Sequence, residues 1–193
     1  MVSRFPRKNV ITHVITYVIT CYNIGMTTES KNFFALYLRN FIFGVEDSLV
    51  STVGLLSGIA TAGVSANTIF LTGVILVFVE AFSMAAGSFL SERSAEEYVT
   101  HRGMPTRSFV LGGIIMFFSY FLSGFIPILP YVLLPINVAF WTSIALALVA
   151  LFVLGVVSAR AFNVNIVRSG FRMLLIGGIA VLLGAGVGSF LNM

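Results

Sequence analysis

Charged residues are scarce in this chain, and their scarcity decides its class. Only 9% of the 193 residues are Asp, Glu, Lys or Arg, whereas 58% are hydrophobic and the mean hydropathy is +1.03. A soluble domain carries about 25% charged residues. The composition therefore excludes an ordinary soluble protein and indicates an integral membrane protein, which we expect to be a multi-pass protein of the cell (inner) membrane.

Cysteine and histidine are also scarce. The chain has one cysteine, Cys21, and two histidines. These numbers exclude a disulfide framework within the chain and a Cys/His zinc cluster. Both histidines lie outside the long apolar runs, and no run contains a Ser/His, His/His or Asp pair with catalytic spacing. We therefore expect no enzyme activity and no resident cofactor.

What the chain does contain is five apolar stretches near the ~20 residues that a transmembrane helix needs. The predicted spans are 38–61, 67–91, 108–128, 137–158 and 170–190. The fold class is thus an all-α membrane protein with five transmembrane helices, formed by residues 38–193. We expect residues 1–37 to be a poorly ordered cytoplasmic segment, and the working protein to begin near Met26.

The basic residues are confined to alternate connections, and hence to one side of the membrane, which predicts the orientation of the chain. All of them lie before or at the start of the first span, in the second connection, or in the fourth connection and at the start of the fifth span: Arg4, Arg7, Lys8, Lys31, Arg39, Arg93, Arg102, Arg107, Arg160, Arg168 and Arg172. Because cytoplasmic loops are enriched in Lys and Arg, we expect the N-terminus in the cytoplasm and the C-terminus outside. This alternation favours a lipid bilayer over nucleic acid as the partner of the positive charge.

Three acidic residues fall inside predicted spans. Glu46, Asp47 and Glu80 have no Lys or Arg deep in a span to neutralise them. An ionised carboxylate near the middle of a transmembrane helix costs about 2.5–3.5 kcal/mol on insertion scales. Each of these groups must therefore be protonated, hydrated or next to a cation. Hydrogen bonding of a protonated acid to a neighbouring helix is the structural alternative.

Depth and helical face bring a candidate metal site together. Asp47 lies eight residues beyond Arg39, and Met84 lies nine residues before Arg93, so both sit at a similar depth. Glu80 is one turn deeper than Met84 on nearly the same face. Carboxylate oxygens with a thioether sulfur favour a first-row transition metal such as Fe²⁺ or Mn²⁺. We expect these three residues to line a translocation path, with Glu46 facing another helix or the rim of that path.

A stripe of small and polar residues follows one face of the first span. Its members are Asn40, Gly44, Asp47, Ser51, Gly54 and Gly58. Small residues let membrane helices approach closely, and the last two form a GxxxG match. We expect the stripe to contact a second copy of the chain, and added bulk at Val53, off the stripe, to be tolerated. Helix packing alone is the alternative.

Acidic residues also gather where the second span ends. Glu92, Glu96 and Glu97 follow it directly. At the mouth of a path they would raise the local concentration of cations. The alternative is a solvated helix end, because exposed charge clusters are common.

Two motifs resemble those of the vacuolar iron transporter family, which includes the yeast calcium-cross-complementing type transporters. "FIFGVEDSLVSTVGLLSGIA" is similar to its first-helix signature and "FSMAAGSFLSERSAEEY" to its second. The resemblance implies a five-helix homodimer that exchanges divalent metal for protons along a path between the subunits, lined by helices one and two. It also implies that Asp47 and Met84 are path ligands.

The sequence departs from this family at two places. Ser88 stands where the family commonly has Glu after "SMAAG", and about sixteen residues replace the long cytoplasmic metal-binding domain between helices two and three. The chain thus resembles a short member without that domain. We expect Glu80 to supply the carboxylate that position 88 lacks.

The resulting functional hypothesis is a dimeric exporter of Fe²⁺ or Mn²⁺ from the cytoplasm in exchange for protons. The alternative is a non-transporting assembly or sensor subunit whose intramembrane acids bind a partner helix. Metal-dependent flux in proteoliposomes separates the two, because only the first moves metal.

Overall fold

The structure, a computed structural model, describes residues 28–100, 106–162 and 164–191. These residues form five helices and their connections, without a strand. The helices are α2 (Thr28–Thr61), α3 (Ala66–Thr100), α4 (Thr106–Leu133), α5 (Ile136–Ala161) and α6 (Ile166–Leu191). Each contains a stretch long and apolar enough to cross a membrane. The prediction of an all-α membrane protein with five spans is confirmed.

Helices α2 and α3 extend well past the spans that hydropathy predicts. Helix α2 begins at Thr28, so residues 28–37, which we assigned to the N-terminal segment, are helical. The rest of that segment, with Cys21 and Met26, lies outside the described residues. Helix α3 continues to Thr100 and α4 begins at Thr106, which leaves no room between them for a long additional domain.

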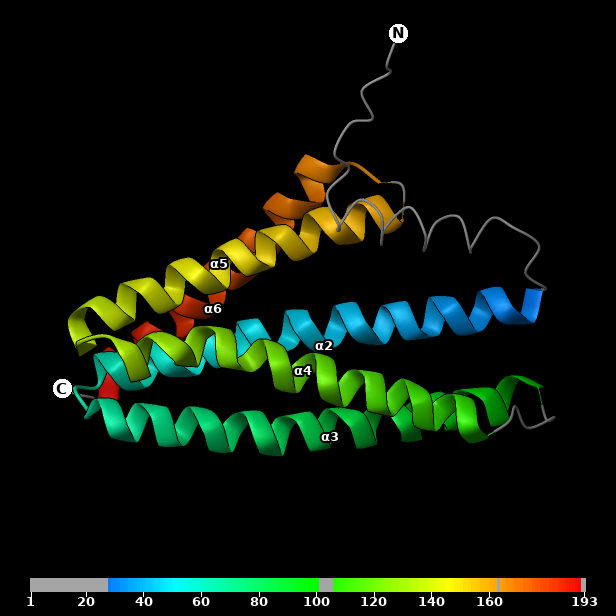
Figure 1. The fold of residues 1–193 in the computed structure, drawn as a ribbon, viewed down its shortest axis with the longest axis horizontal. Helices are drawn as coiled ribbons and strands as arrows, with labels where there is room; N and C mark the ends of the chain where they lie inside the picture. Colours follow the sequence, from blue (N-terminus) through cyan, green and yellow to red (C-terminus); the bar gives the residue numbers. More distant parts are fainter. Residues whose placement is uncertain (1–27, 101–105, 163, 192–193) are drawn as a thin grey trace, which may run out of the picture.

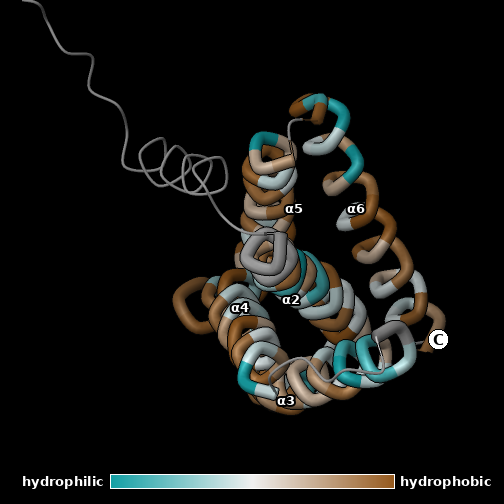
Figure 2. The backbone as a smooth tube through the Cα atoms, turned by 90° about the vertical axis from the view of Figure 1, so that its right-hand side faces the viewer, coloured by the Kyte–Doolittle hydropathy of each residue, from teal (hydrophilic) through white to brown (hydrophobic). Residues whose placement is uncertain are grey.

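Helix α2 is the centre of the bundle. Figure 1 shows α2, α3 and α4 running side by side, while α5 and α6 diverge from them toward the end where α2 begins. Figure 2 places α2 between α3 and α4 on one side and α5 and α6 on the other. Half of its membrane-spanning window is buried, the largest share among the five described spans. Residues of α2 can therefore face every other helix.

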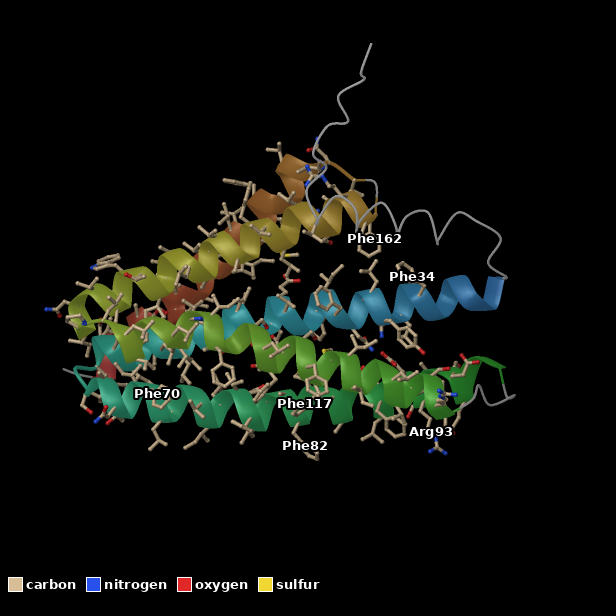
Figure 3. All side chains as sticks on the ribbon, viewed as in Figure 1. Phe34, Phe70, Phe82, Arg93, Phe117 and Phe162 are labelled. Carbon is tan, nitrogen blue, oxygen red and sulfur yellow. The ribbon has the colours of Figure 1, made fainter. Side chains whose placement is uncertain are left out.

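The outer surface of the bundle is apolar. Phe82 on α3 and Leu182 on α6 are 70% and 73% exposed, and Figure 3 shows Phe82 pointing away from the bundle. Hydrophobic residues cover most of each helix in Figure 2. Such a surface is stable against lipid, because hydrocarbon chains are as apolar as these side chains. The distribution agrees with an integral membrane protein.

The turn between α2 and α3 is fixed by local chemistry. Gly63 has a φ of 76°, a left-handed conformation that residues with a Cβ rarely adopt. Ser65 then caps α3, because its hydroxyl oxygen accepts the backbone N–H of Thr68 at 3.3 Å. The two helices are thereby held antiparallel, which sets the register of the site described below.

The small residues of α2 contact α6 of the same chain. A Cβ added at Gly54 would lie 3.2 Å from the carbonyl oxygen of Ala180, and one at Gly58 would lie 2.8 Å from that of Gly184. The GxxxG match is therefore an intramolecular helix contact, and our prediction of a subunit contact there is wrong. Val53 is fully buried, so the predicted tolerance of added bulk is wrong as well.

Candidate functional site

Helices α2 and α3 are aligned by a contact between their polar ends. Arg39 Nη2 lies 3.0 Å from Glu92 Oε1. Eight residues further along α2 is Asp47, and eight residues back along α3 is Met84. Because antiparallel helices rise equally per residue, these two residues lie at the same level. The register therefore agrees with the common depth that the sequence predicts.

Two carboxylates on these helices lie near enough to interact electrostatically. Asp47 on α2 lies within electrostatic range of Glu80 on α3, and both side chains are only partly buried. Met84, also partly buried, follows Glu80 by one turn. Asp47 and Glu80 are thus near enough to interact, and Met84 adjoins Glu80 along the same face of α3. Two acidic groups within electrostatic range of each other in an apolar surrounding repel each other unless protons or a cation balance them.

Tyr120 of α4 completes this polar group, and sequence reasoning missed it. Its hydroxyl lies 2.7 Å from Ser51 Oγ and within electrostatic range of both Asp47 and Glu80. The side chain is fully buried. A phenol in the middle of an apolar span was the available signal, because a buried tyrosine hydroxyl usually has a hydrogen-bond partner. The spacing of α4 alone could not identify that partner.

A cleft of about 570 Å³ opens beside Met84, at the end of the bundle where α2 begins. It is lined by Arg39, Asn40, Phe43, Ser83, Met84, Gly87, Ser88, Ser91 and Met116. Met116 of α4 adds a second thioether: its side chain is buried, and a Cβ at Gly44 would lie 3.1 Å from its sulfur. Sequence reasoning did not select Met116, since methionine is a common core filler.

Glu92 is buried in the wall beside this cleft, which corrects our expectation of a residue at an open mouth. Only 4% of its side chain is exposed. Its Oε1 accepts from Arg39 at 3.0 Å, from Asn40 Nδ2 at 2.8 Å and from Ser88 Oγ at 3.0 Å. Helix α3 does not end at the predicted span boundary, so Glu92 faces α2 instead of solvent.

Three of the predicted acids have other surroundings or further partners: Glu46, Glu96 and Glu97. Glu46 lies within electrostatic range of its neighbour Asp47 and of Arg172 on α6. Glu97 is exposed and accepts from Arg93 Nε at 2.8 Å, one turn away on the same helix. Figure 3 shows Arg93 pointing away from the bundle. Glu96 is partly buried. Glu97 matches the alternative of a solvated helix end.

One chain offers an incomplete set of metal ligands. Within residues 28–100, 106–162 and 164–191, no three His, Cys, Asp or Glu side chains lie close enough together to hold a metal ion. The α2–α3 face presents two carboxylates, Asp47 and Glu80, with the Met84 thioether near them. Such donors suit a divalent transition metal only if further ligands reach the same place.

Five apolar helices with acidic residues between them define an integral, multi-pass membrane protein with an intramembrane polar site. The family model of the VIT family matches residues 38–108 and 99–189, from α2 to α6. The chain therefore belongs to the VIT family, a family of membrane metal-ion transporters. This confirms the resemblance of the two motifs, including the short form without a long domain between α3 and α4. No curated protein matches the chain.

Proposed function

We propose that this protein exports a divalent transition metal, Fe²⁺ or Mn²⁺, from the cytoplasm in exchange for protons. The observation that carries the proposal is the approach of Asp47 and Glu80 between α2 and α3, with Met84 one turn away. Membership of a metal-ion transporter family supports transport over a purely structural role.

The chemistry of Asp47, Glu80 and Met84 suits both a divalent metal ion and protons as substrates. A divalent cation between two carboxylates removes their mutual repulsion and the cost of placing charge within the membrane. When the metal leaves, protons restore neutrality, because an ionised carboxyl without a cation is unfavourable there. The thioether makes the site softer and favours a transition metal over Mg²⁺ or Ca²⁺.

A homodimer would complete the site. The α2–α3 face is open in one chain: Ser83 is exposed, and a Cβ added at Gly87 would have no atom within 4 Å. A second copy with the same face apposed would contribute another Asp47, Glu80 and Met84 around a two-fold axis. The path would then run between the subunits, lined by α2 and α3.

The basic residues define the orientation that we propose. Arg39 on α2, Arg93 on α3 and Arg107 on α4 lie toward the end of the bundle where α2 begins, as do Arg160 and Arg168 on α5 and α6. The positive-inside rule places this end in the cytoplasm and the C-terminus outside the cell membrane. The cleft beside Met84 then opens toward the cytoplasm.

Metal uptake into inverted membrane vesicles tests the function. Wild type is expected to accumulate Fe²⁺ or Mn²⁺ and release protons. Asp47→Ala is expected to abolish uptake, because the ion loses a charged ligand where water is scarce. Glu97→Ala, which removes an exposed carboxylate on α3, is the matched control and should keep the wild-type rate. Uptake by wild type no faster than by vesicles without the protein would favour a non-transporting subunit, and a wild-type rate in Asp47→Ala would remove Asp47 from the path.

A further inference from the structure

The cleft beside Met84 carries a positive group that a metal ion must pass. Of the residues that line it, only Arg39 is charged, and 65% of its side chain is exposed. A fixed positive charge at the entrance of a narrow cleft repels cations. A path for divalent metal therefore requires that this charge be cancelled.

Glu92 is built into the wall in a position that cancels it. Its Oε1 collects three donors from two helices: Arg39 and Asn40 of α2, and Ser88 of α3. Asn40 Nδ2 also donates to Ser88 Oγ at 3.0 Å, so the donors hold one another in place. The carboxylate is thus fixed by neutral hydrogen bonds as well as by the arginine.

The Glu92 carboxylate is also held by packing against α4, in addition to its ion pair and hydrogen bonds. Its Oε2 is buried without a hydrogen-bond partner and packs toward Gly112 of α4, where a Cβ would lie 3.0 Å from it. The same Cβ would lie 2.9 Å from Asn40 Nδ2. Glycine at position 112 therefore makes room for a buried acid. Because a buried ion pair seldom adds stability by itself, this arrangement indicates a role other than stability.

We propose that Glu92 is a positioning residue for metal entry: it holds Arg39 against the wall of the cleft and neutralises it, so that a divalent cation can approach Met84. This inference rests on the proposed transport function for its substrate. It differs from a structural latch in one respect. The two members of a charge-balancing pair have opposite effects when removed singly, whereas the two members of a latch have the same effect.

A cysteine reporter measures the charge of the cleft without requiring transport. In a Cys21→Ser background, Ser91→Cys places a thiol on an exposed residue that lines the cleft. The rates of its reaction with positively and negatively charged methanethiosulfonate reagents are compared in reconstituted protein. Glu92→Gln is expected to lower the ratio of positive to negative rates about tenfold, and Arg39→Gln to raise it.

The double variant Arg39→Gln/Glu92→Gln should return the ratio close to wild type, and 1 M salt should reduce the differences between the single variants. Divalent metal flux should follow the same order. The matched control is Arg93→Gln/Glu97→Gln, an exposed pair on the same helix, which should leave the ratio unchanged. If Glu92→Gln does not reconstitute, the opposite sign expected for Arg39→Gln still tests the proposal.

Four outcomes decide the matter. Opposite shifts in the two single variants, with flux following them, support the proposal. If both variants change the rates with both reagents in the same direction, the proposal is overturned in favour of a structural latch. If neither variant changes the rates, the pair has no role in the charge of the cleft, which also overturns the proposal. If the two single variants shift the ratio in opposite directions but wild type moves no divalent metal, the proposed transport function is overturned and the charge-balancing role stays intact.

Discussion

The two sides of α2 show opposite ways of packing a membrane helix. Toward α6 its surface is glycine, and backbone lies against backbone: a Cβ at Gly58 would be 2.8 Å from the carbonyl oxygen of Gly184. Toward α3 the same helix presents Asn40 and Asp47, and a cleft of about 570 Å³ opens beside Met84. The side toward α6 is closely packed, and the side toward α3 carries polar groups beside an open cleft.

The two sides of α2 therefore have different roles: the side toward α6 stabilises the fold, and the side toward α3 carries the groups suited to transport. Close approach of small residues gives van der Waals contact and leaves no room for water or an ion. A polar face with open volume contributes less packing, but it can exchange a cation for protons. We expect substitutions on the α6 side to change the free energy of unfolding, and substitutions on the α3 side to change transport.

The largest expected effect is on the glycine side. In Gly184→Ala the new Cβ would collide with the Gly54 carbonyl group, whose carbon would be 2.8 Å away. Forced backbone separation of this kind costs about 1–3 kcal/mol or more. Gly186→Ala is the control on the same helix, since nothing lies within 4 Å of its Cβ. Unfolding of both variants in mixed micelles tests this, and equal midpoints would contradict the close contact.

The next effect concerns the polar side. Glu80→Gln keeps the shape of the side chain near Asp47 but removes a group that can bind and release a proton. A single proton-linked step changes a rate by up to about tenfold per pH unit, and we expect the variant to lose most of this dependence. Metal uptake measured at three pH values checks it. A pH profile identical to that of wild type would remove Glu80 from the proton pathway.

Much of the fold followed from hydropathy, because a bilayer requires every spanning segment to satisfy its own backbone hydrogen bonds. Five apolar stretches therefore had to be helices. Their ends were less predictable: α3 runs to Thr100 because polar residues can continue a helix beyond the membrane. The choice of neighbour was also hidden. Gly54 and Gly58 predict a close helix contact, but nothing in the local sequence indicates whether the partner is α6 or a helix of a second chain.

The candidate site was predictable where one helix determines it. Asp47, Glu80 and Met84 follow from depth and face, which depend only on helical rise and turn. Tyr120 and Glu92 depend on contacts between helices far apart in sequence, such as Asn40 with Glu92. Their pairing requires the three-dimensional register of α2 with α3 and α4. A charged residue near a span boundary gives no indication of whether it faces solvent or a neighbouring helix.

A smaller effect is expected from the sulfur atom on the polar side. Met84→Leu keeps the volume and removes only the thioether, so the protein should fold normally. Transport of Fe²⁺ should fall relative to Mn²⁺, because the softer ion gains more from sulfur. Met173→Leu, in the core cluster with Leu49 and Leu151, is the control for a buried sulfur that does not line the cleft. Competition between the two metals in vesicle uptake gives the ratio, and an unchanged ratio would remove the sulfur from the path.

The smallest effect is expected from Arg93→Ala, which tests whether charge on α3 matters only where it faces α2. Arg93 and Glu97 form an exposed pair with side chains 52% and 60% accessible. Such pairs contribute about 0.3–0.5 kcal/mol, because water and salt screen them. Arg93→Ala should therefore leave both the unfolding midpoint and metal uptake near wild type. Arg39→Ala, which deprives the buried Glu92 of its charged donor, should lower the unfolding midpoint and, because the charge of Glu92 is then not cancelled beside the cleft, raise metal uptake. A change in metal uptake in Arg93→Ala as large as in Arg39→Ala would mean that net positive charge, and not the face that bears it, governs this end of the bundle.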